Sequence, residues 1–333
     1  MTSRFTSGSQ KSSVVTPDGG ECLHSAHEAH VTVMLCTFNG ERFLAEQLDS
    51  IARQTHTKWS VVVSDDGSSD ATLDILRSYQ SRWGGDKLVI VNGPRKGFAK
   101  NFMSVAYGLE GASDYYSWAD QDDIWHEEKI EEALNWIGTV PENIPALYCG
   151  RTETITADGT SVGQSPLFKR PPSFSNSLVQ SIAGGNTMVF NRAALKVLKA
   201  IGSDFSIVSH DWWAYMVVCG IGGVVHYDER SFVRYRQHGG NLVGANSSFF
   251  SRLKRIRMIL SGRFCVWNQL NITALESMES LLSNESKTIL CDFKQSRNGN
   301  VFKRIFYLKR SGVYRQTWFG GCALIFAVLC NAI

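Results

Sequence analysis

The sequence lacks the features that mark multi-span membrane proteins and secreted disulfide scaffolds. Its longest apolar stretch, residues 318–330, is shorter than the roughly 20 residues that a membrane-spanning helix needs. Residues 1–30 contain no apolar core of a signal peptide, so we expect no secretory signal. The eight cysteines include no C-x-x-C pair, and we interpret them as reduced thiols of a cytoplasmic protein.

Two phosphate-binding motifs are also missing. The chain contains neither GxGxxG nor GxxxxGK[ST], which disfavours a Rossmann dinucleotide site and a P-loop. With 43% hydrophobic and 20% charged residues, its composition is that of a globular protein and excludes a mainly disordered chain. Its 333 residues allow one large domain or two modest ones.

The net charge of +3 conceals an asymmetry along the chain. Residues 244–333 contain 13 Lys and Arg against 4 Asp and Glu, whereas residues 1–243 contain 21 against 27. Segments 251–264 and 303–315 mix cations with apolar or aromatic residues. They predict either solvated charged faces or helices lying on an anionic membrane surface, on the inner face of the cell membrane. No nucleic-acid-binding motif accompanies the charge, so we expect no nucleic-acid partner.

Strands and helices alternate over the first half of the chain. Apolar runs predict buried strands at 31–37, 59–67, 87–92, 115–123 and 146–150, and helical spacing predicts helices at 41–54, 70–80, 98–109 and 127–137. This alternation predicts an α/β fold with a mostly parallel sheet flanked by helices.

The pattern changes after residue 150. We expect a hairpin at residues 158–159, a strand at 186–191, helices at 192–200 and 211–218, and two short strands within 222–238. Beyond residue 247 the chain is predicted to be mainly helical. The predicted organisation is a disordered tail at 1–30, a catalytic domain at 31–245 and a basic, possibly membrane-associated helical extension at 246–333.

Carboxylates follow two of the predicted strands, where parallel α/β sheets bind ligands. Asp120 and Asp122 lie on the same side of an extended segment, and hard cations such as Mg²⁺ or Mn²⁺ prefer such oxygens together with substrate phosphates. Asp123 is an alternative N-cap for a helix starting near Trp125. Asp65 is a candidate contact to a nucleotide base or ribose.

Six segments carry a family resemblance, in the order TFNGERFLAEQLDSI, VVVSDDGSSDAT, SWADQDDIW, GGNTMVFNR, HDWW and YRQHGGN. Over residues 31–245 the chain resembles family 2 glycosyltransferases, especially the rhamnosyltransferase-like group of bacterial surface-polysaccharide biosynthesis. The resemblance implies a GT-A fold, a nucleotide-diphospho-sugar donor, a divalent cation and inverting transfer of one sugar to a saccharide or lipid-linked oligosaccharide acceptor.

The resemblance also implies roles for individual residues. It implies a nucleotide-sugar site formed by Thr37, Asn39, Asp65, Asp66 and Asp120, and metal binding by Asp120 and Asp122. From their residue types, Lys100 and Arg236 are further candidates for the nucleotide-sugar site and His238 for the metal site. Gly185, Asn186 and Trp212 are candidates for an acceptor site. Asp211 matches the catalytic base that takes the acceptor proton. The alternatives are a helix N-cap for Asp211, a buried satisfied pair for Arg236 and His238, and a solvated helix start for Lys100.

Two other functions remain open at this point. A nucleotidyltransferase that makes sugar nucleotides also uses an α/β sheet and Mg²⁺, but the Gly-rich, Arg/Lys-bearing first loop of that class is missing here. A catalytically inactive binding module is the other alternative. It is expected to have lost carboxylates, yet Asp65, Asp120, Asp122 and Asp211 are all present.

Overall fold

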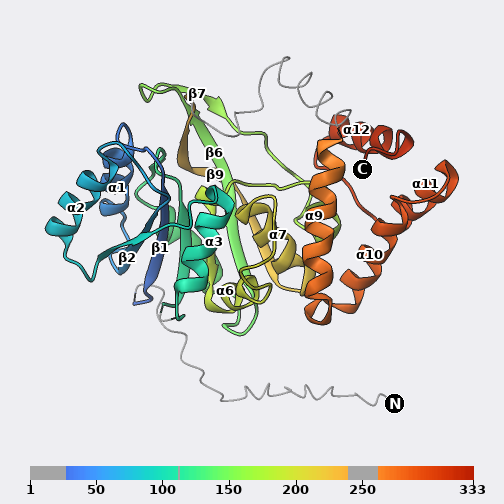
Figure 1. Cartoon of the computed structure of the whole chain (residues 1–333), viewed down its shortest axis with the longest axis horizontal. Helices are drawn as coiled ribbons and strands as arrows, with labels where there is room; N and C mark the ends of the chain where they lie inside the picture. Colours follow the sequence, from blue (N-terminus) through green and yellow to red (C-terminus); the bar gives the residue numbers. More distant parts are fainter. Residues whose placement is uncertain (1–27, 112, 239–261) are drawn as a thin grey trace, which may run out of the picture.

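The computed structural model describes residues 28–111, 113–238 and 262–333 (Figure 1). The chain starts with β1 (Val31–Thr37), α1 (Leu44–Ala52), β2 (Trp59–Asp65), α2 (Thr72–Trp83), β3 (Leu88–Asn92), α3 (Phe98–Gly108) and β4 (Tyr115–Ala119). Every residue of β1 is buried because the strand lies between β2 and β4. Its odd-numbered side chains enter the core beside α1 and α2, and Met34 and Cys36 enter the core on the opposite face.

The middle of the chain completes the sheet. Its elements are β5 (Ile124–Trp125), α4 (Lys129–Ile137), β6 (Ala146–Ile155), β7 (Ser161–Gln164), α5 (Phe174–Ser177), the 3₁₀ turn η1 (Gly185–Thr187), β8 (Val189–Asn191), α6 (Arg192–Lys199), α7 (His210–Gly220) and β9 (Val224–Arg236). The prediction of two strands in 222–238 is wrong, because β9 runs unbroken along β6. A bulge in the pairing beside Gly150 absorbs the irregular sequence. The strand predicted at 115–123 ends at Ala119.

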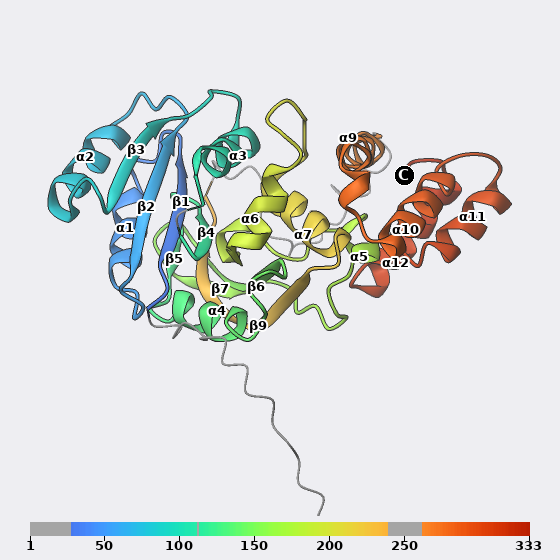
Figure 2. The ribbon, with the colours of Figure 1, turned by 90° about the horizontal axis from the view of Figure 1, so that it is seen from below.

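The sheet has the order β3-β2-β1-β4-β8-β6-β9-β5, with β7 paired to β6. The strands β1, β2, β3, β4, β6 and β9 run in one direction, and only the short β5, β7 and β8 oppose them. Helices α1, α2 and α4 cover one face, and α3, α6 and α7 cover the other (Figure 2). The carboxyl ends of β1, β2 and β4 therefore meet at one edge, with Thr37 paired to Asp65. The predicted α/β fold is confirmed.

The C-terminal part is helical, as predicted, over its described residues. It contains α9 (Arg263–Ser277), the 3₁₀ turn η2 (Glu279–Leu281), α10 (Asn284–Gln295), α11 (Val301–Arg310) and α12 (Trp318–Leu329). Side-chain oxygens of Ser283, Asn300 and Thr317 accept backbone N–H groups at the starts of α10, α11 and α12. These helices form the end of the molecule beside α5 and α7, opposite α1 and α2 (Figures 1 and 2).

Residues 1–27 of the predicted tail and most of segment 251–264 lie outside the described residues, as does the boundary predicted at residue 245. The division into domains therefore stays a prediction. Within the described ranges, no helix combines the length and the apolar character needed to cross a bilayer.

Candidate active site

The loop after β2 is organised around Asp65, which is 5% exposed. Its carboxylate accepts hydrogen bonds from the Thr37 hydroxyl at 2.8 Å, from the Ser68 hydroxyl at 2.5 Å and from the Gly67 and Ser68 N–H groups at 3.1 and 2.8 Å. The structure thus brings Thr37 and Asp65 together. Protein donors occupy both Asp65 oxygens, so its contact with a nucleotide base stays a prediction.

Asn39 and Asp66 join three neighbouring loops at this edge. The Asn39 amide oxygen accepts the Ser69 N–H at 2.9 Å, and the exposed Asn39 has a φ of 48°. Asp66 accepts the N–H groups of Arg95 at 2.5 Å and Gly97 at 3.1 Å. The loops following β1, β2 and β3 are therefore fixed to one another, as a preformed ligand surface requires.

The acidic loop between β4 and β5 is the second part of the site. Asp123 is fully buried and accepts hydrogen bonds from the Asn186 amide and from the Arg236 N–H at 3.2 Å. The proposed N-cap role of Asp123 is wrong, because the nearest helix, α4, begins at Lys129 and has Glu128 at its N-cap position. Asp123 instead ties the acidic loop to η1 and to the end of β9.

Asp122 and His238 contact each other directly, so metal binding by this pair stays a prediction. The Asp122 carboxylate lies 2.8 Å from His238 Nε2. Arg236 differs from its prediction as a diphosphate ligand, because its guanidinium is 1% exposed and faces protein acceptors. It donates to the Asp122 carbonyl at 3.0 Å, to Ala157 O at 2.7 Å and to the Glu46 carboxylate at 2.6 Å. The buried alternative is the one observed for Arg236.

The carboxylates of this loop share one electrostatic environment with Asp211. Burial raises the pKa of Asp120 well above its usual range, and the negative charges of Asp123, Asp122 and Asp211 raise it further. Burial and the charge of Asp122 raise the pKa of Asp123 to about 8. Asp120 receives no hydrogen bond from any described residue. A bound cation would offset this charge.

The donor atoms fit a hard divalent cation. Asp120 and Asp122 supply carboxylate oxygens, which Mg²⁺ and Mn²⁺ prefer. Across residues 28–111, 113–238 and 262–333, no three His, Cys, Asp or Glu side chains are gathered into a complete metal centre. The metal binding predicted for Asp120, Asp122 and His238 therefore stays a prediction.

Asp211 lies in the first turn of α7. The N-cap position is Ser209, so the proposed N-cap role of Asp211 is wrong. One Asp211 carboxylate oxygen accepts the Trp212 N–H at 2.7 Å. Trp212 is also misassigned to the acceptor site, because it is 6% exposed and its indole N–H donates to Ser177 O at 2.6 Å. The Trp212 side chain packs in the apolar core.

Gly185 and Asn186 lie beside the acidic loop but are buried, at the turn η1. Asn186 donates to Asp123, and a Cβ added to Gly185 would lie 2.3 Å from His210 Nε2. The absence of a side chain at residue 185 therefore makes room for His210. An acceptor contact of Gly185 and Asn186 stays a prediction.

Lys100 holds the loop that leads into α7. Its Nζ donates to Ser203 O at 2.9 Å and to Phe205 O. Neither the predicted donor-sugar contact nor a freely solvated helix start describes this arrangement. Lys100 links α3 to the segment that positions Asp211.

Sequence reasoning missed two residues that shape this site. Gln121 accepts the Phe38 N–H at 2.8 Å and donates to Phe38 O at 3.0 Å, which locks the loop after β1 to the acidic loop. Its place inside the acidic motif was the available signal. Lys129 is 1% exposed, donates to the Ser117 hydroxyl at 2.9 Å and has a pKa held well below its usual range by burial. No periodicity in the sequence marks it.

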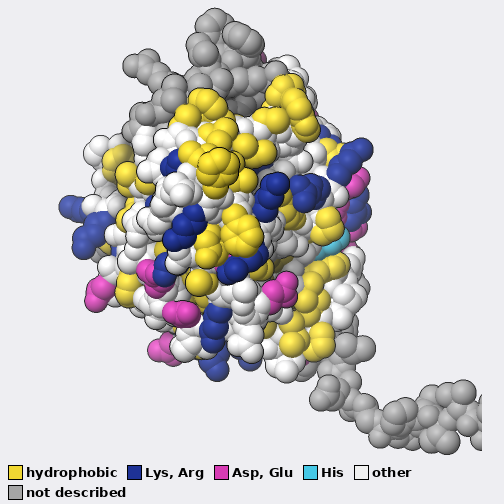
Figure 3. All heavy atoms as spheres, turned by 90° about the vertical axis from the view of Figure 1, so that its right-hand side faces the viewer, with side chains coloured by type: hydrophobic (Ala, Val, Ile, Leu, Met, Phe, Trp, Pro, Cys, Tyr) yellow, Lys and Arg dark blue, Asp and Glu magenta, His cyan; other side chains and the backbone are white. Residues whose placement is uncertain are grey.

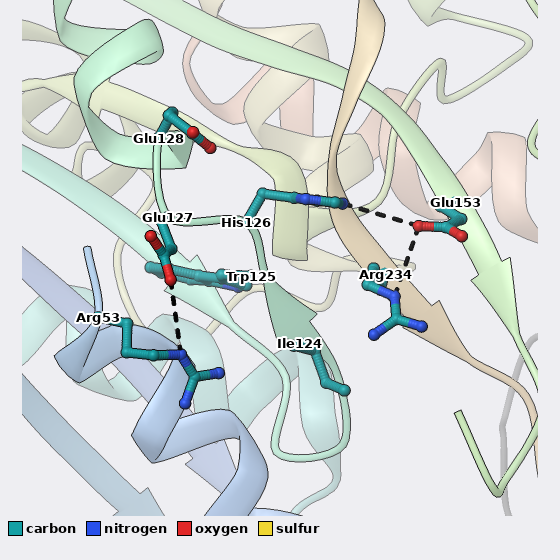
Figure 4. A pocket seen from close by; sticks show the side chains of 8 residues that line it. All are labelled: Arg53, Ile124, Trp125, His126, Glu127, Glu128, Glu153 and Arg234. Carbon is teal, nitrogen blue, oxygen red and sulfur yellow. Dashed lines mark ion pairs between the residues drawn. The ribbon is translucent and has the colours of Figure 1, made fainter. Parts of the chain in front are cut away.

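An open pocket of about 550 Å³ lies elsewhere, where β5 and β9 meet the end of α1. Among the described residues that line it, none is a predicted site residue. His126 and Arg234 point toward Glu153, at 3.7 and 3.5 Å, and Arg53 pairs with Glu127 at 4.0 Å (Figure 4). Five of its six charged or titratable side chains thus take part in ion pairs within the pocket.

Comparison with known proteins identifies relatives of the whole α/β part of the chain. Over 237 residues the chain is 28% identical to the dTDP-rhamnosyl transferase RfbG of Shigella flexneri, covering 68% of this chain and 78% of that protein. It is 29% identical to an uncharacterised glycosyltransferase of Rickettsia typhi, over 36% of each chain.

Among solved structures, residues 1–349 of S. aureus TarS in complex with UDP-GlcNAc match with a TM-score of 0.50 and 17% identity, over 86% of this chain and 93% of that one. This likeness shows the fold, which is the predicted GT-A type. The sequence model described as Glycosyl transferase family 2 matches residues 32–198, about half of the chain. The protein therefore belongs to glycosyl transferase family 2.

Proposed function

We propose that this glycosyltransferase moves one sugar, rhamnose, from a nucleotide-diphosphate donor to a growing lipid-linked glycan of a bacterial surface polysaccharide. One observation carries the proposal. The negative charges of Asp122 and of Asp211, which lies about 90 residues further along the chain, both act on Asp120. No described residue donates a hydrogen bond to Asp120. The relative named as a dTDP-rhamnosyl transferase supports the choice of sugar.

A divalent cation, Mg²⁺ or Mn²⁺, is the proposed partner of these carboxylates. Asp120 and Asp122 would hold it, with His238 beside Asp122. When bound, it would supply Lewis-acid stabilisation of the charge on the leaving diphosphate. Arg236 would position this site without touching the cation, because its guanidinium donates hydrogen bonds to the Asp122 carbonyl and to the Glu46 carboxylate.

Asp211 is the proposed general base. A single displacement at the anomeric carbon inverts its configuration and needs one group to take the proton of the acceptor hydroxyl. One carboxylate is enough for this role, in contrast to the two of glycoside hydrolases. Asp211 sits at the start of α7, whose preceding loop is held by Lys100.

The proposed location is the cytoplasmic face of the cell membrane, where a lipid-linked acceptor would be presented. The basic C-terminal part supports this location, since residues 244–333 contain 13 cations and 4 anions.

The test combines a donor panel with one substitution. Purified protein is titrated with dTDP-, UDP- and GDP-sugars in Mg²⁺ or Mn²⁺, and transfer is measured with a lipid-linked acceptor. Asp211→Asn should lower turnover by about 10²–10⁴-fold and leave donor affinity unchanged. The matched control is Asp204→Asn, an exposed carboxylate in the loop before α7 that should keep normal turnover. Full turnover by Asp211→Asn would refute the base assignment, and failure of every donor to bind with metal would refute the transferase.

A further inference from the structure

The last helix, α12, is apolar on two opposite faces. Leu324, Ala327 and Val328 are buried against the rest of the molecule. The outward-facing side chains follow helical spacing and are apolar too. They are Trp318, Phe319, Ile325, Phe326 and Leu329, whose exposed fractions fall from 75% at Trp318 to 44% at Leu329. A helix that is apolar all round is normally enclosed by protein or lipid.

Helix α11, which contacts α12, also exposes apolar side chains. Phe302 and Phe306 are 86% and 57% exposed on it. The buried Arg304 joins the two helices by donating to Leu329 O at 3.3 Å. We call the exposed apolar residues of α11 and α12 together with Lys303, Lys309 and Arg310 the α11–α12 face. Figure 3 views the C-terminal end of the molecule and shows hydrophobic side chains interspersed with Lys and Arg.

The charge of residues 301–333 indicates which partner binds the α11–α12 face. Residues 301–333 contain five Lys and Arg and no Asp or Glu. Arg310 pairs with Asp292 of α10, and Lys303 and Lys309 are exposed. A second copy bound symmetrically would bring these cations against the same cations. An anionic lipid surface instead attracts them, and helices that lie in the interface carry Trp and Phe on their apolar face.

We propose that the α11–α12 face binds the surface of a membrane that contains anionic phospholipid, with α12 lying in the plane of the interface. At 12 residues and roughly 18 Å, α12 is too short to cross the bilayer and long enough to lie on it. The inference deepens the proposed membrane location and is independent of the donor and the sugar. It identifies the helix pair, rather than the basic charge alone, as the contact.

Flotation of the full-length protein with vesicles tests this proposal. Vesicles of phosphatidylcholine alone are compared with vesicles that also contain phosphatidylglycerol, at low and high salt and without nucleotide sugar. We expect binding only to the anionic vesicles, weakened by salt. Phe302→Ser with Trp318→Ser should reduce binding by about tenfold or more, and Lys303→Glu with Lys309→Glu should reduce it similarly at low salt.

Two control variants match these changes elsewhere on the surface. Val162→Ser removes an apolar side chain of β7 that is 59% exposed, and Lys196→Glu reverses an exposed charge of α6; both should bind as the unchanged protein does. Equal binding to neutral and anionic vesicles, or wild-type binding by both altered pairs, would overturn the proposal. The proposal would also be overturned if the protein bound no vesicles and instead formed a dimer in solution that the Phe302 and Trp318 substitutions abolish. Vesicle binding by a protein that binds no donor would refute the transferase and leave this surface in place.

Discussion

His210 makes the stability of this protein depend on pH in a way that can be measured. The side chain is 4% exposed, stacks on Phe102 with ring centroids 3.8 Å apart and meets the edge of Trp118 at 4.6 Å. Neither ring nitrogen has a hydrogen-bond partner among the residues that the structure describes. Burial in this apolar box lowers the pKa of His210 from 6.5 to about 4, so the folded protein holds a neutral imidazole near neutral pH.

The sign of the effect follows from proton binding. Between about pH 6.5 and pH 4 the unfolded chain binds a proton at His210 that the folded chain excludes, so the free energy of unfolding falls as pH falls. The distance between the two pKa values corresponds to about 3 kcal/mol at most. This stabilisation is present above pH 6.5 and is lost as pH falls toward 4.

Urea unfolding of the wild type and of His210→Leu, at about pH 7 and about pH 4.5, isolates this contribution. The leucine variant should be less stable at pH 7 because of imperfect packing, yet lose about 2–3 kcal/mol less than the wild type on acidification. Phe102→Leu is the control, since it disturbs the same box and retains the titratable ring. Equal pH dependence in wild type and His210→Leu would refute the reasoning.

Two further predictions concern neighbouring residues. Gly185→Ala places a methyl group 2.3 Å from His210 Nε2 and should lower the free energy of unfolding by about 1–3 kcal/mol, whereas Gly85→Ala, in open space, should be near neutral in thermal unfolding. Arg236→Met removes a buried cation that binds the Asp122 carbonyl, so it should destabilise the fold by about 3 kcal/mol and weaken metal-dependent donor binding. Unchanged calorimetric stability of Arg236→Met would contradict the positioning role given to Arg236.

The α/β part of the fold could be predicted because strands buried on both faces read as continuous apolar runs. Residues 31–37 are such a run, and the predicted strand matches β1 at both ends. β9 was misread because residues 222–238 mix charged and apolar residues, which resembles two short strands. In the structure the whole of β9 pairs with β6, with a bulge beside Gly150. Local sequence patterns cannot predict this pairing, because the two strands are far apart in the chain.

The carboxylates could be located because the carboxyl ends of parallel strands meet at one edge. The cations could not be assigned in the same way. In the sequence Lys100 looks like a contact of the donor sugar and Arg236 like a ligand of the diphosphate. Their observed partners are carbonyls and Glu46 from distant segments. Trp212 was misassigned for the related reason that sequence does not show which face of α7 meets the core. The sequence shows which residues are charged, but it does not show which distant groups they contact in the fold.

The acidic residues at this sheet edge differ in how fully the protein already satisfies them. Asp65 accepts four hydrogen bonds from its own loop and from β1, so its charge serves the fold. Asp120 accepts none from any described residue, and Asp211 accepts only the N–H of its neighbour in the chain. A half-buried carboxylate without a protein donor is costly when charged, so a bound cation would offset the charge of Asp120. The residues that bind the ligand are therefore expected among the unsatisfied acids, and a cation should stabilise the protein through Asp120 rather than through Asp65.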